Sequence, residues 1–220
     1  MIDIHHLRFA WPRAPRDTLA IDALHVGAGE TVFLHGPSGC GKSTLLGLLA
    51  GVLVPTAGEV RLRGQPWSTL RGALRDRLRA DHLGYIFQQF NLLPYLSVLD
   101  NVLLPCRFSA ARARRAGATQ AQDLLLRVGL DAELWPRRAD ALSVGQQQRV
   151  AAARALIGAP DLVIADEPTS ALDAALRDDF MALLLQQCRA GGSTLVFVSH
   201  DERLAVHFDR RLSLPELNTA

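Results

Sequence analysis

The chain has 220 residues, a net charge of +2 at neutral pH and 49% hydrophobic residues, which suits a domain with a sizeable core. So small a positive excess gives no indication of nucleic-acid binding, and three scattered cysteines match neither a disulfide framework nor a metal site. The longest apolar run, residues 45–54, is about half of the ~20 residues that cross a bilayer, and the N-terminus lacks the features of a signal peptide. We therefore expect a cytoplasmic protein without a membrane span.

The first element with a predicted chemical function is a loop between a predicted strand, residues 30–35, and a predicted helix from residue 45. The loop has the spacing Gly-x-x-x-x-Gly-Lys-Ser-Thr, and its Lys42 is the only lysine among 24 basic residues. A compact ammonium acts as a point charge between phosphate oxygens. The pattern predicts a phosphate loop, with the Ser43 hydroxyl on Mg²⁺ and backbone N–H groups on the nucleotide. Its residues are Gly36, Pro37, Ser38, Gly39, Cys40, Gly41, Lys42, Ser43 and Thr44.

An arginine-bearing stretch at residues 109–130 lies in a part of the chain that is rich in helix signals. It contains Arg112, Arg114 and Arg115. Because the net charge is small, we expect this cluster to be a solvated helix face rather than a nucleic-acid contact.

A second candidate anion site lies at the start of a predicted alanine-rich helix. Ser143 stands at the expected N-cap, followed by Gly145 and Gln146. One phosphate loop is enough to bind the chain's own ATP. The second helix start therefore suggests contact with the γ-phosphate of a nucleotide on another subunit. The alternative is an ordinary capped helix.

Two adjacent carboxylates follow a predicted buried strand at residues 162–167, where a parallel strand would face a ligand. Asp166 would hold Mg²⁺ through its water shell, and Glu167 would act as general base on the attacking water. The alternative is a solvated acidic turn before Pro168. The phosphate loop earlier in the chain favours the catalytic interpretation.

Together these motifs resemble the ATP-binding cassette (ABC) family over nearly the whole chain. The family's signature, Leu-Ser-Gly-Gly-Gln, corresponds to residues 142–146, with Val144 in place of the first glycine. We expect this departure to alter turnover rather than abolish it. The resemblance implies that Ser143, Gly145 and Gln146 contact the nucleotide of a second cassette.

The resemblance also implies roles for four further residues. Gln88 matches the family's glutamine loop, whose amide contacts Mg²⁺ or the attacking water, and His200 matches the switch histidine that bonds the γ-phosphate. Asp173 matches a loop through which two subunits signal, and it is also a candidate N-cap. Trp11 stands where the family stacks adenine on an aromatic ring; the alternative is an anchor for the following turn.

The fold class that the resemblance implies is α/β. It would be a P-loop NTPase core with a mainly parallel sheet, an N-terminal antiparallel β region and an inserted helical subdomain. Residues 1–220 would form a single ABC ATPase domain. Its catalytic lobe would comprise residues 1–87 and 145–220, and residues 88–144 would form the helical subdomain.

The function that the resemblance implies is that of an ATPase subunit of a membrane transporter, with ATP and Mg²⁺ as cofactors. Two cassettes, expected to be identical, would close on two ATP molecules and pull on a separate integral membrane permease docked at the helical subdomain. This places the chain on the inner face of the cell membrane.

Within the family, residues 88–94 and the compact length are similar to the cassettes of macrolide exporters and lipoprotein-release systems. That subgroup would add a periplasmic or membrane-fusion partner of the permease. Rival interpretations are a soluble cassette ATPase acting on ribosomes or DNA, and a nucleotide kinase. A kinase has no use for the signature helix.

Overall fold

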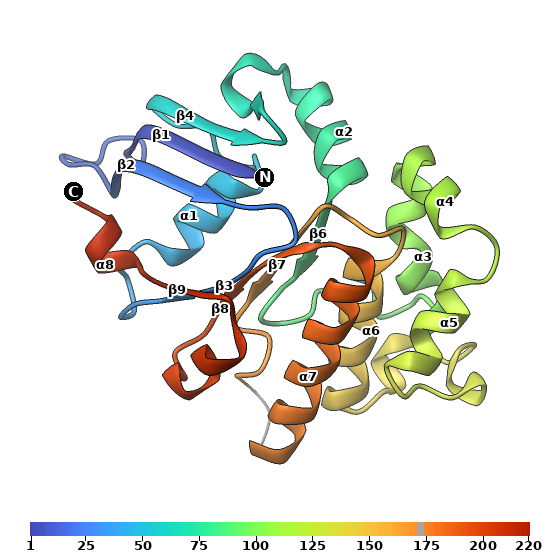
Figure 1. Ribbon diagram of the computed structural model, residues 1–220. Helices are drawn as coiled ribbons and strands as arrows, with labels where there is room; N and C mark the ends of the chain where they lie inside the picture. The colour runs from blue at the N-terminus through green and yellow to red at the C-terminus, as the bar shows by residue number, and fades with distance from the viewer. Residues whose placement is uncertain (171–173) are drawn as a thin grey trace.

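Strands form two sheets in the computed structural model, which describes residues 1–170 and 174–220 (Figure 1). One sheet is antiparallel with the order β2-β1-β4-β5, and the other is parallel with the order β6-β7-β8-β3-β9. This arrangement confirms the predicted α/β class. The strands are β1 (Ile2–Phe9), β2 (Leu19–Val26), β3 (Thr31–His35), β4 (Ala57–Leu62), β5 (Gln65–Pro66), β6 (Leu83–Ile86), β7 (Leu162–Asp166), β8 (Thr194–Val198) and β9 (Arg210–Ser213).

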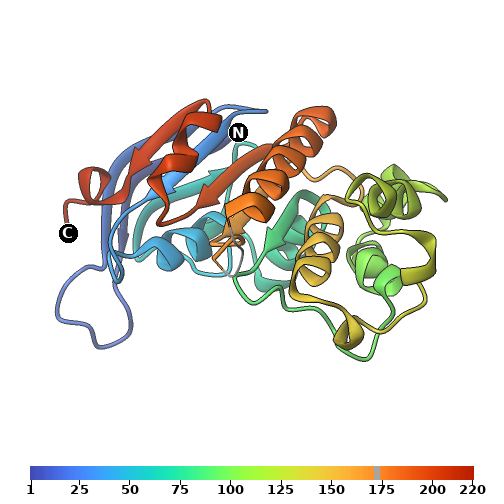
Figure 2. The same cartoon turned by 90° about the horizontal axis from the view of Figure 1, so that it is seen from below.

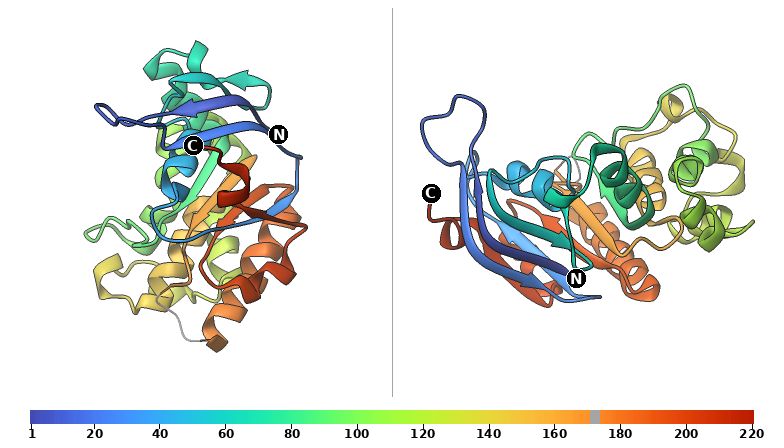
Figure 3. Two further views of the ribbon diagram at one scale, coloured as in Figure 1. Left: turned by 90° about the vertical axis from the view of Figure 1, so that its left-hand side faces the viewer. Right: turned by 90° about the horizontal axis from the view of Figure 1, so that it is seen from above.

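Helices pack on the parallel sheet and extend beyond one end of it. In Figure 2 and the right-hand view of Figure 3, α3, α4 and α5 gather at the end of the molecule opposite the antiparallel sheet. A bilayer-spanning helix is not found in the part of the chain that the structure describes. The helices are α1 (Lys42–Leu49), α2 (Gly72–His82), α3 (Val98–Phe108), α4 (Ala110–Ala116), α5 (Gln120–Arg127), α6 (Val144–Leu156), α7 (Ala174–Gly191) and α8 (Leu214–Leu217), with 3₁₀ turns η1 (Trp67–Thr69), η2 (Ala132–Leu134), η3 (Ala139–Ala141) and η4 (Glu202–His207).

The parallel sheet separates two apolar cores, because side chains alternate between the faces of each strand. In β3, Val32 and Leu34 belong to the core shared with α1 and the antiparallel sheet, whereas Phe33 belongs to the core shared with α6 and α7. Phe33 stacks there on Phe197 of β8, with ring centroids 6.3 Å apart. Burial on both faces accounts for the continuous apolar runs of β3, β7 and β8.

The carboxyl ends of four parallel strands meet at one edge of this sheet. The register aligns Val198 of β8 with Leu34 of β3 on one side and with Asp166 of β7 on the other. The strand order therefore brings together segments from four distant parts of the sequence. One or two residues after these four strand ends, the sequence has Gly36, Gln88, Glu167 and His200.

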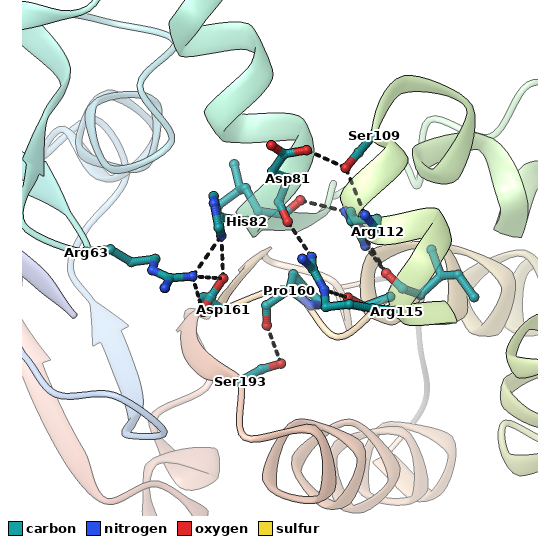
Figure 4. A network of polar contacts seen from close by, with 12 residues as sticks. Arg63, Asp81, His82, Ser109, Arg112, Arg115, Pro160, Asp161 and Ser193 are labelled. Atoms are coloured by element: carbon teal, nitrogen blue, oxygen red, sulfur yellow. Dashed lines mark hydrogen bonds and ion pairs between the residues drawn. The ribbon is translucent and has the colours of Figure 1, made fainter. Parts of the chain in front are cut away.

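The arginines of α4 form only in part the solvated face that the charge pattern predicts. Arg112 is 2% exposed, and its guanidinium donates to backbone carbonyl oxygens at the start of β6 and the end of α6 (Figure 4). Arg115 donates to the carbonyl oxygens of Asp81 and Gly158. The prediction holds for Arg114 and Arg115, which are exposed, although Arg115 also donates to two carbonyl groups. It is wrong for the buried Arg112, because carbonyl groups at helix ends need hydrogen-bond donors.

Candidate functional site

The phosphate loop turns from β3 into α1 through a glycine that no other residue could replace without strain. Gly41 is the N-cap of α1 and has φ = 104°, a region that side chains rarely adopt. A Cβ atom there would lie 2.8 Å from Leu19 Cδ2 of β2. The loop can therefore follow this path only with glycine at this position.

Lys42 is buried inside the curve of the loop, with 8% of its surface exposed. Its ammonium donates to the carbonyl oxygens of Gly36 at 2.8 Å and Pro37 at 3.0 Å. Ser43, the next residue, is exposed at the start of α1. The first two residues of α1 thus supply an ammonium and a hydroxyl at a helix N-terminus, which is the composition of an anion and metal site.

Asp166 ends β7 close to the phosphate loop. Burial, and next the negative charge of Glu167, raise the pKa of the Asp166 carboxyl, while the charge of Lys42 and a hydrogen bond from Tyr85 oppose this shift. A carboxylate that is penalised by burial and by a neighbouring acid gains from a bound cation. Lys42 and Asp166, predicted from separate motifs, therefore belong to one site.

Glu167 lies between the two other predicted catalytic side chains. His200 Nε2 is 2.6 Å from Glu167 Oε1, and Gln88 Nε2 is 3.5 Å from Glu167 Oε2. Glu167 also has φ = 46°, and its backbone N–H donates to the Val198 carbonyl at 3.0 Å. This left-handed backbone turns the carboxylate out of the line of β7, and such strain is typical of functional positions.

The start of α6 is closed by a reciprocal pair of hydrogen bonds. The backbone N–H of Gln146 donates to Ser143 Oγ at 3.3 Å, and the backbone N–H of Ser143 donates to Gln146 Oε1 at 3.0 Å. Ser143 and Val144 are exposed. Figures 1 and 2 both place this helix apart from α1, so the two predicted anion sites do not form a single site within this chain.

Trp11 follows β1 at the start of the loop that joins β1 to β2, and this loop projects from the antiparallel sheet (Figure 2). The indole is 46% exposed and meets the Phe9 ring edge-on, with centroids 5.2 Å apart. Phe9 itself is buried, as its alternate position on the strand predicts. Asp173 lies outside the described residues.

Two residues near the site were not singled out from the sequence. The Tyr85 hydroxyl hydrogen-bonds the Asp166 carboxylate, and burial raises the pKa of Tyr85. Arg154 of α6 is 8% exposed and donates to the carbonyl oxygens of Asn91 at 2.7 Å and Phe90 at 2.5 Å, which holds the segment behind Gln88. An arginine within an alanine-rich helix was the available signal for Arg154.

Comparison with known proteins decides the family. The family model described as ABC transporter matches residues 20–170, more than half of the chain. The chain belongs to the ABC transporter ATP-binding cassettes. The lipoprotein-releasing system ATP-binding protein LolD of Anaeromyxobacter dehalogenans is 47% identical over 191 residues, which cover 87% of this cassette and 80% of LolD. YbbA of Escherichia coli K12, an uncharacterized ABC transporter ATP-binding protein, is 42% identical over 218 residues, with 97% and 94% coverage.

Solved structures agree with this family and with the fold. The dimeric post-hydrolysis structure of the ATP-binding cassette MJ0796, bound to ADP and Pi, matches with a TM-score of 0.85 and 34% identity, covering 97% of this cassette and 94% of that chain. The chain cbiO1 of Clostridium perfringens, part of the transporter complex cbiONQ, matches with a TM-score of 0.81 and 25% identity, covering 96% and 83%. The cassette is therefore an ATP-binding and ATP-hydrolysing subunit of an ABC transporter. The alternative of a ribosome- or DNA-directed ATPase finds no support in these comparisons.

Proposed function

We propose that two copies of this cassette bind two ATP molecules between them, and that closure of the pair drives a separate membrane permease. The observation that carries this proposal is Gly145. It has no positive φ, and a Cβ atom there would meet nothing within 4 Å among the described residues. Since its own chain does not require a glycine in the first turn of α6, the open backbone N–H groups suit the phosphate of a nucleotide on a second copy. The dimeric MJ0796 structure, with ADP and Pi bound, supports this arrangement.

The predicted residues fit a magnesium ion with ATP. Ser43, Asp166 and Gln88 offer a hydroxyl, a carboxylate and an amide oxygen, the donors that Mg²⁺ prefers. The raised pKa of the Asp166 carboxyl, caused first by burial, indicates a group that a cation would stabilise. When bound, Mg²⁺ would neutralise charge on the β- and γ-phosphates.

We assign the general base to Glu167. Its carboxylate accepts a hydrogen bond from His200 Nε2, which fixes the position of one oxygen and sets the proton on that ring nitrogen. The second oxygen faces the Gln88 amide. In this role Glu167 takes a proton from water that attacks the γ-phosphate, while His200 and Gln88 hold the carboxylate and the water in line.

Three further residues are proposed to contact nucleotide: Trp11 on the adenine of this copy, and Ser143 and Gln146 on the nucleotide of the partner copy. Trp11, fixed edge-on to Phe9, keeps a ring face free for stacking on adenine. Ser143 and Gln146 would contact the partner's nucleotide beside Gly145. Asp173 is proposed as a signalling contact between the two copies on the basis of its motif alone.

The permease is proposed to dock in a groove of about 980 Å³ between α2 and the helices that follow β6. Its lining combines apolar side chains, including Val52, Phe87 and Phe108, with arginines such as Arg77 and Arg114. Phe87 directly precedes Gln88, so a docked segment lies next to the catalytic site. The surface fits a permease segment with one apolar face and acidic flanks, on the cytoplasmic side of the membrane. In this scheme residues 88–144 act as the helical subdomain between the catalytic lobe segments 1–87 and 145–220.

For the cargo, we propose a lipid-anchored protein or another amphiphile removed from the membrane. The 47% identity to LolD, a protein of a lipoprotein-releasing system, supports this class. A periplasmic or membrane-fusion protein would then receive the cargo from the permease. An exporter of small amphiphiles is the second candidate, and resemblance to the macrolide-exporter cassettes favours it.

The Glu167→Gln variant tests the proposal. The change keeps the shape of the side chain and its hydrogen-bond acceptor but removes the base, so hydrolysis should fall by about 10²-fold or more. ATP binding should persist, and ATP should trap the variant as a dimer on gel filtration. The control is Glu133→Gln, at an exposed glutamate in η2, which should hydrolyse ATP normally. Unchanged hydrolysis by Glu167→Gln would remove Glu167 from the base role.

The trapped dimer then identifies the partner. Tagged Glu167→Gln cassette, purified with ATP from its native membranes, should bring a polytopic membrane protein, which mass spectrometry can identify. If ribosomal or DNA-associated proteins were purified instead, the result would contradict the proposal that the partner is a membrane permease.

A further inference from the structure

Arg112 of α4 is a buried cation whose partners are all backbone carbonyl groups. Its guanidinium donates from Nε to Ile157 O at 2.8 Å, from Nη2 to Ala155 O at 2.8 Å and from Nη1 to Leu83 O at 2.9 Å (Figure 4). None of the described carboxylates forms an ion pair with it. Burying an arginine costs free energy unless its donors are satisfied, so the position requires this specific set of acceptors.

These acceptors lie at the ends of three other elements, α6, α2 and β6. Ala155 and Ile157 lie at the C-terminus of α6, and Leu83 caps α2 and begins β6. Arg115 repeats the pattern, since it donates to Gly158 O at 2.6 Å and to Asp81 O at 2.5 Å. We call Arg112 and Arg115 the arginine clamp. Carbonyl groups at helix C-termini carry partial negative charge, so two cations there hold both ends to α4.

The backbone segments around the clamp pack so closely that two glycine positions have no space for a side chain. Gly158 has φ = 68°, and a Cβ atom there would lie 2.7 Å from the Arg112 carbonyl oxygen. A Cβ atom at Gly84 of β6 would lie 2.2 Å from the Ala155 carbonyl oxygen. Both glycines allow α4 and β6 to approach the end of α6 closely. The clamp therefore fixes α6 against β6 at contact distance.

The end of α2 is anchored to the catalytic lobe independently of α4. His82 Nδ1 is 2.5 Å from Asp161 Oδ2, and Arg63 Nη1 is 2.9 Å from Asp161 Oδ1, beside the start of β7 (Figure 4). Ser109, the N-cap of α4, donates to the Asp81 carboxylate. Through the end of α2, the clamp thus connects α6 to Asp161, directly before β7 of the parallel sheet.

Two of the clamped elements, α6 and β6, carry proposed nucleotide-binding and catalytic groups at their far ends. Ser143 caps the N-terminus of α6, and β6 leads to Gln88. α6 has 13 residues, so it is about 20 Å long, and a rotation of about 3° at the clamped end would move Ser143 by about 1 Å. A displacement of that size is enough to disturb a phosphate contact.

We infer that the arginine clamp is a positioning device that aligns the start of α6 with the nucleotide of the partner cassette; this inference rests on the proposed function. Arg112 touches no nucleotide and acts through α6. Arg112, Ser109 and Asp81 also line the groove proposed for the permease. A permease segment docked in this groove therefore lies against the clamp. Its binding acts through the clamp on the alignment of α6.

The test uses the isolated cassette in the Glu167→Gln background. Arg112→Lys keeps the charge but cannot reach all three carbonyl groups, and Arg115→Gln removes the exposed half of the clamp. ATP affinity of the monomer should stay within about twofold, because the phosphate loop is untouched, whereas the dimer dissociation constant should rise about tenfold for Arg112→Lys and less for Arg115→Gln. With Glu167 restored, hydrolysis should be lost at low protein concentration and recover at high concentration. Arg127→Lys, at an exposed position in the last turn of α5 and outside the groove, is the matched control and should leave every value unchanged.

The outcomes separate this inference from the proposed function. A Glu167→Gln parent that remains monomeric with ATP contradicts the proposed function and the clamp with it. A parent that dimerises, with both clamp variants dimerising equally well, contradicts the clamp alone. Equal losses of monomer ATP affinity and of dimerisation in both variants would show a general loss of structure and also overturn the inference.

Discussion

Gly145 offers the sharpest test at the scale of single residues. Glycine within a helix lowers stability by about 1 kcal/mol relative to alanine, and nothing in this chain's packing requires it at that position. Gly145→Ala should therefore leave the free energy of unfolding unchanged or raise it by up to about 1 kcal/mol. It should nevertheless prevent ATP-dependent dimerisation, because the new methyl group would stand where the partner's phosphate approaches. Urea denaturation and gel filtration with ATP measure the two effects.

Gly72 provides the matched control. It is the first residue of α2, and a Cβ atom there would also meet nothing within 4 Å among the described residues. Gly72→Ala should give the same small gain in stability and dimerise normally in the Glu167→Gln background. Normal dimerisation by Gly145→Ala would show that α6 does not contact the partner's nucleotide through this glycine.

The site residues differ in how far the sequence could predict them. Lys42 and Ser43 lie within a local spacing that specifies a loop, so their positions follow from nearby residues. Arg112 could not be predicted in this way, because its partners Leu83 and Ala155 are 29 and 43 residues distant in sequence. Only the tertiary fold brings the ends of α2, α6 and β6 to α4. Charge pattern alone therefore favoured the wrong environment for this arginine.

At the scale of elements, the turn η4 fixes the segment that carries His200. Asp201 accepts hydrogen bonds from the backbone N–H of Arg203 at 3.2 Å and from Arg203 Nε at 2.8 Å, and Arg177 Nη1 is 2.7 Å from its second oxygen. The Arg203 hydrogen bond is the largest cause that lowers the pKa of Asp201 from 3.8 to about 2. The folded state therefore prefers the ionised carboxylate.

This shift predicts a pH-dependent loss of stability in Asp201→Asn. A depressed pKa adds stability above the unfolded value of 3.8, and that stability is lost as the pH falls through about 2. Wild type should exceed the variant by about 1 kcal/mol at pH 7, after allowance for solvent screening. The difference should shrink as the pH falls below 4, measured by urea denaturation at several pH values. A difference that is constant from pH 7 to pH 3 would contradict the role of the ionised carboxylate.

Element boundaries show what local sequence can and cannot specify. The predicted strand at 162–167 agrees with β7, except that its last residue, Glu167, has left the strand with a positive φ. The helix signals at 109–130 divide into α4 and α5. Gly117, with φ = 60°, ends α4. Apolar runs and periodicity predict the elements, whereas their ends depend on single backbone conformations.

At the scale of the whole molecule, the family resemblance predicted the layers that local patterns could not. The order β6-β7-β8-β3-β9 places β3, from the N-terminal part of the sequence, between β8 and β9 from its C-terminal part. Such long-range parallel pairing leaves no local trace, because β3, β7 and β8 are each simply an apolar run that does not specify its neighbour. The part between residues 88 and 144 also contains irregular structure, including a bridge between Ser97 and Arg138. Its role as a separate subdomain remains a prediction.

The trans arrangement of the two copies can be tested by mixing two inactive variants. Lys42→Ala removes the phosphate contact, and Ser143→Glu places a negative charge where the partner's phosphate should bind. In the trans arrangement, each ATP site consists of the phosphate loop of one copy and the start of α6 of the other copy. In a mixed dimer, one of these sites then holds both defects and the other holds neither. If half of the dimers in an equimolar mixture are mixed, hydrolysis should recover to about a quarter of the wild-type rate.

A cis arrangement gives the opposite result. If Ser143 acted on its own chain's nucleotide, each subunit of the mixed dimer would carry one defect at its own site, and no activity would return. Mixing Lys42→Ala with the double variant Lys42→Ala, Ser143→Glu is the control, because neither copy then supplies an intact phosphate loop. Recovery in the first mixture alone would therefore require that each ATP be held by the loop of one copy and the α6 helix of the other. No recovery, with mixed dimers detected by differential tagging, would exclude that arrangement.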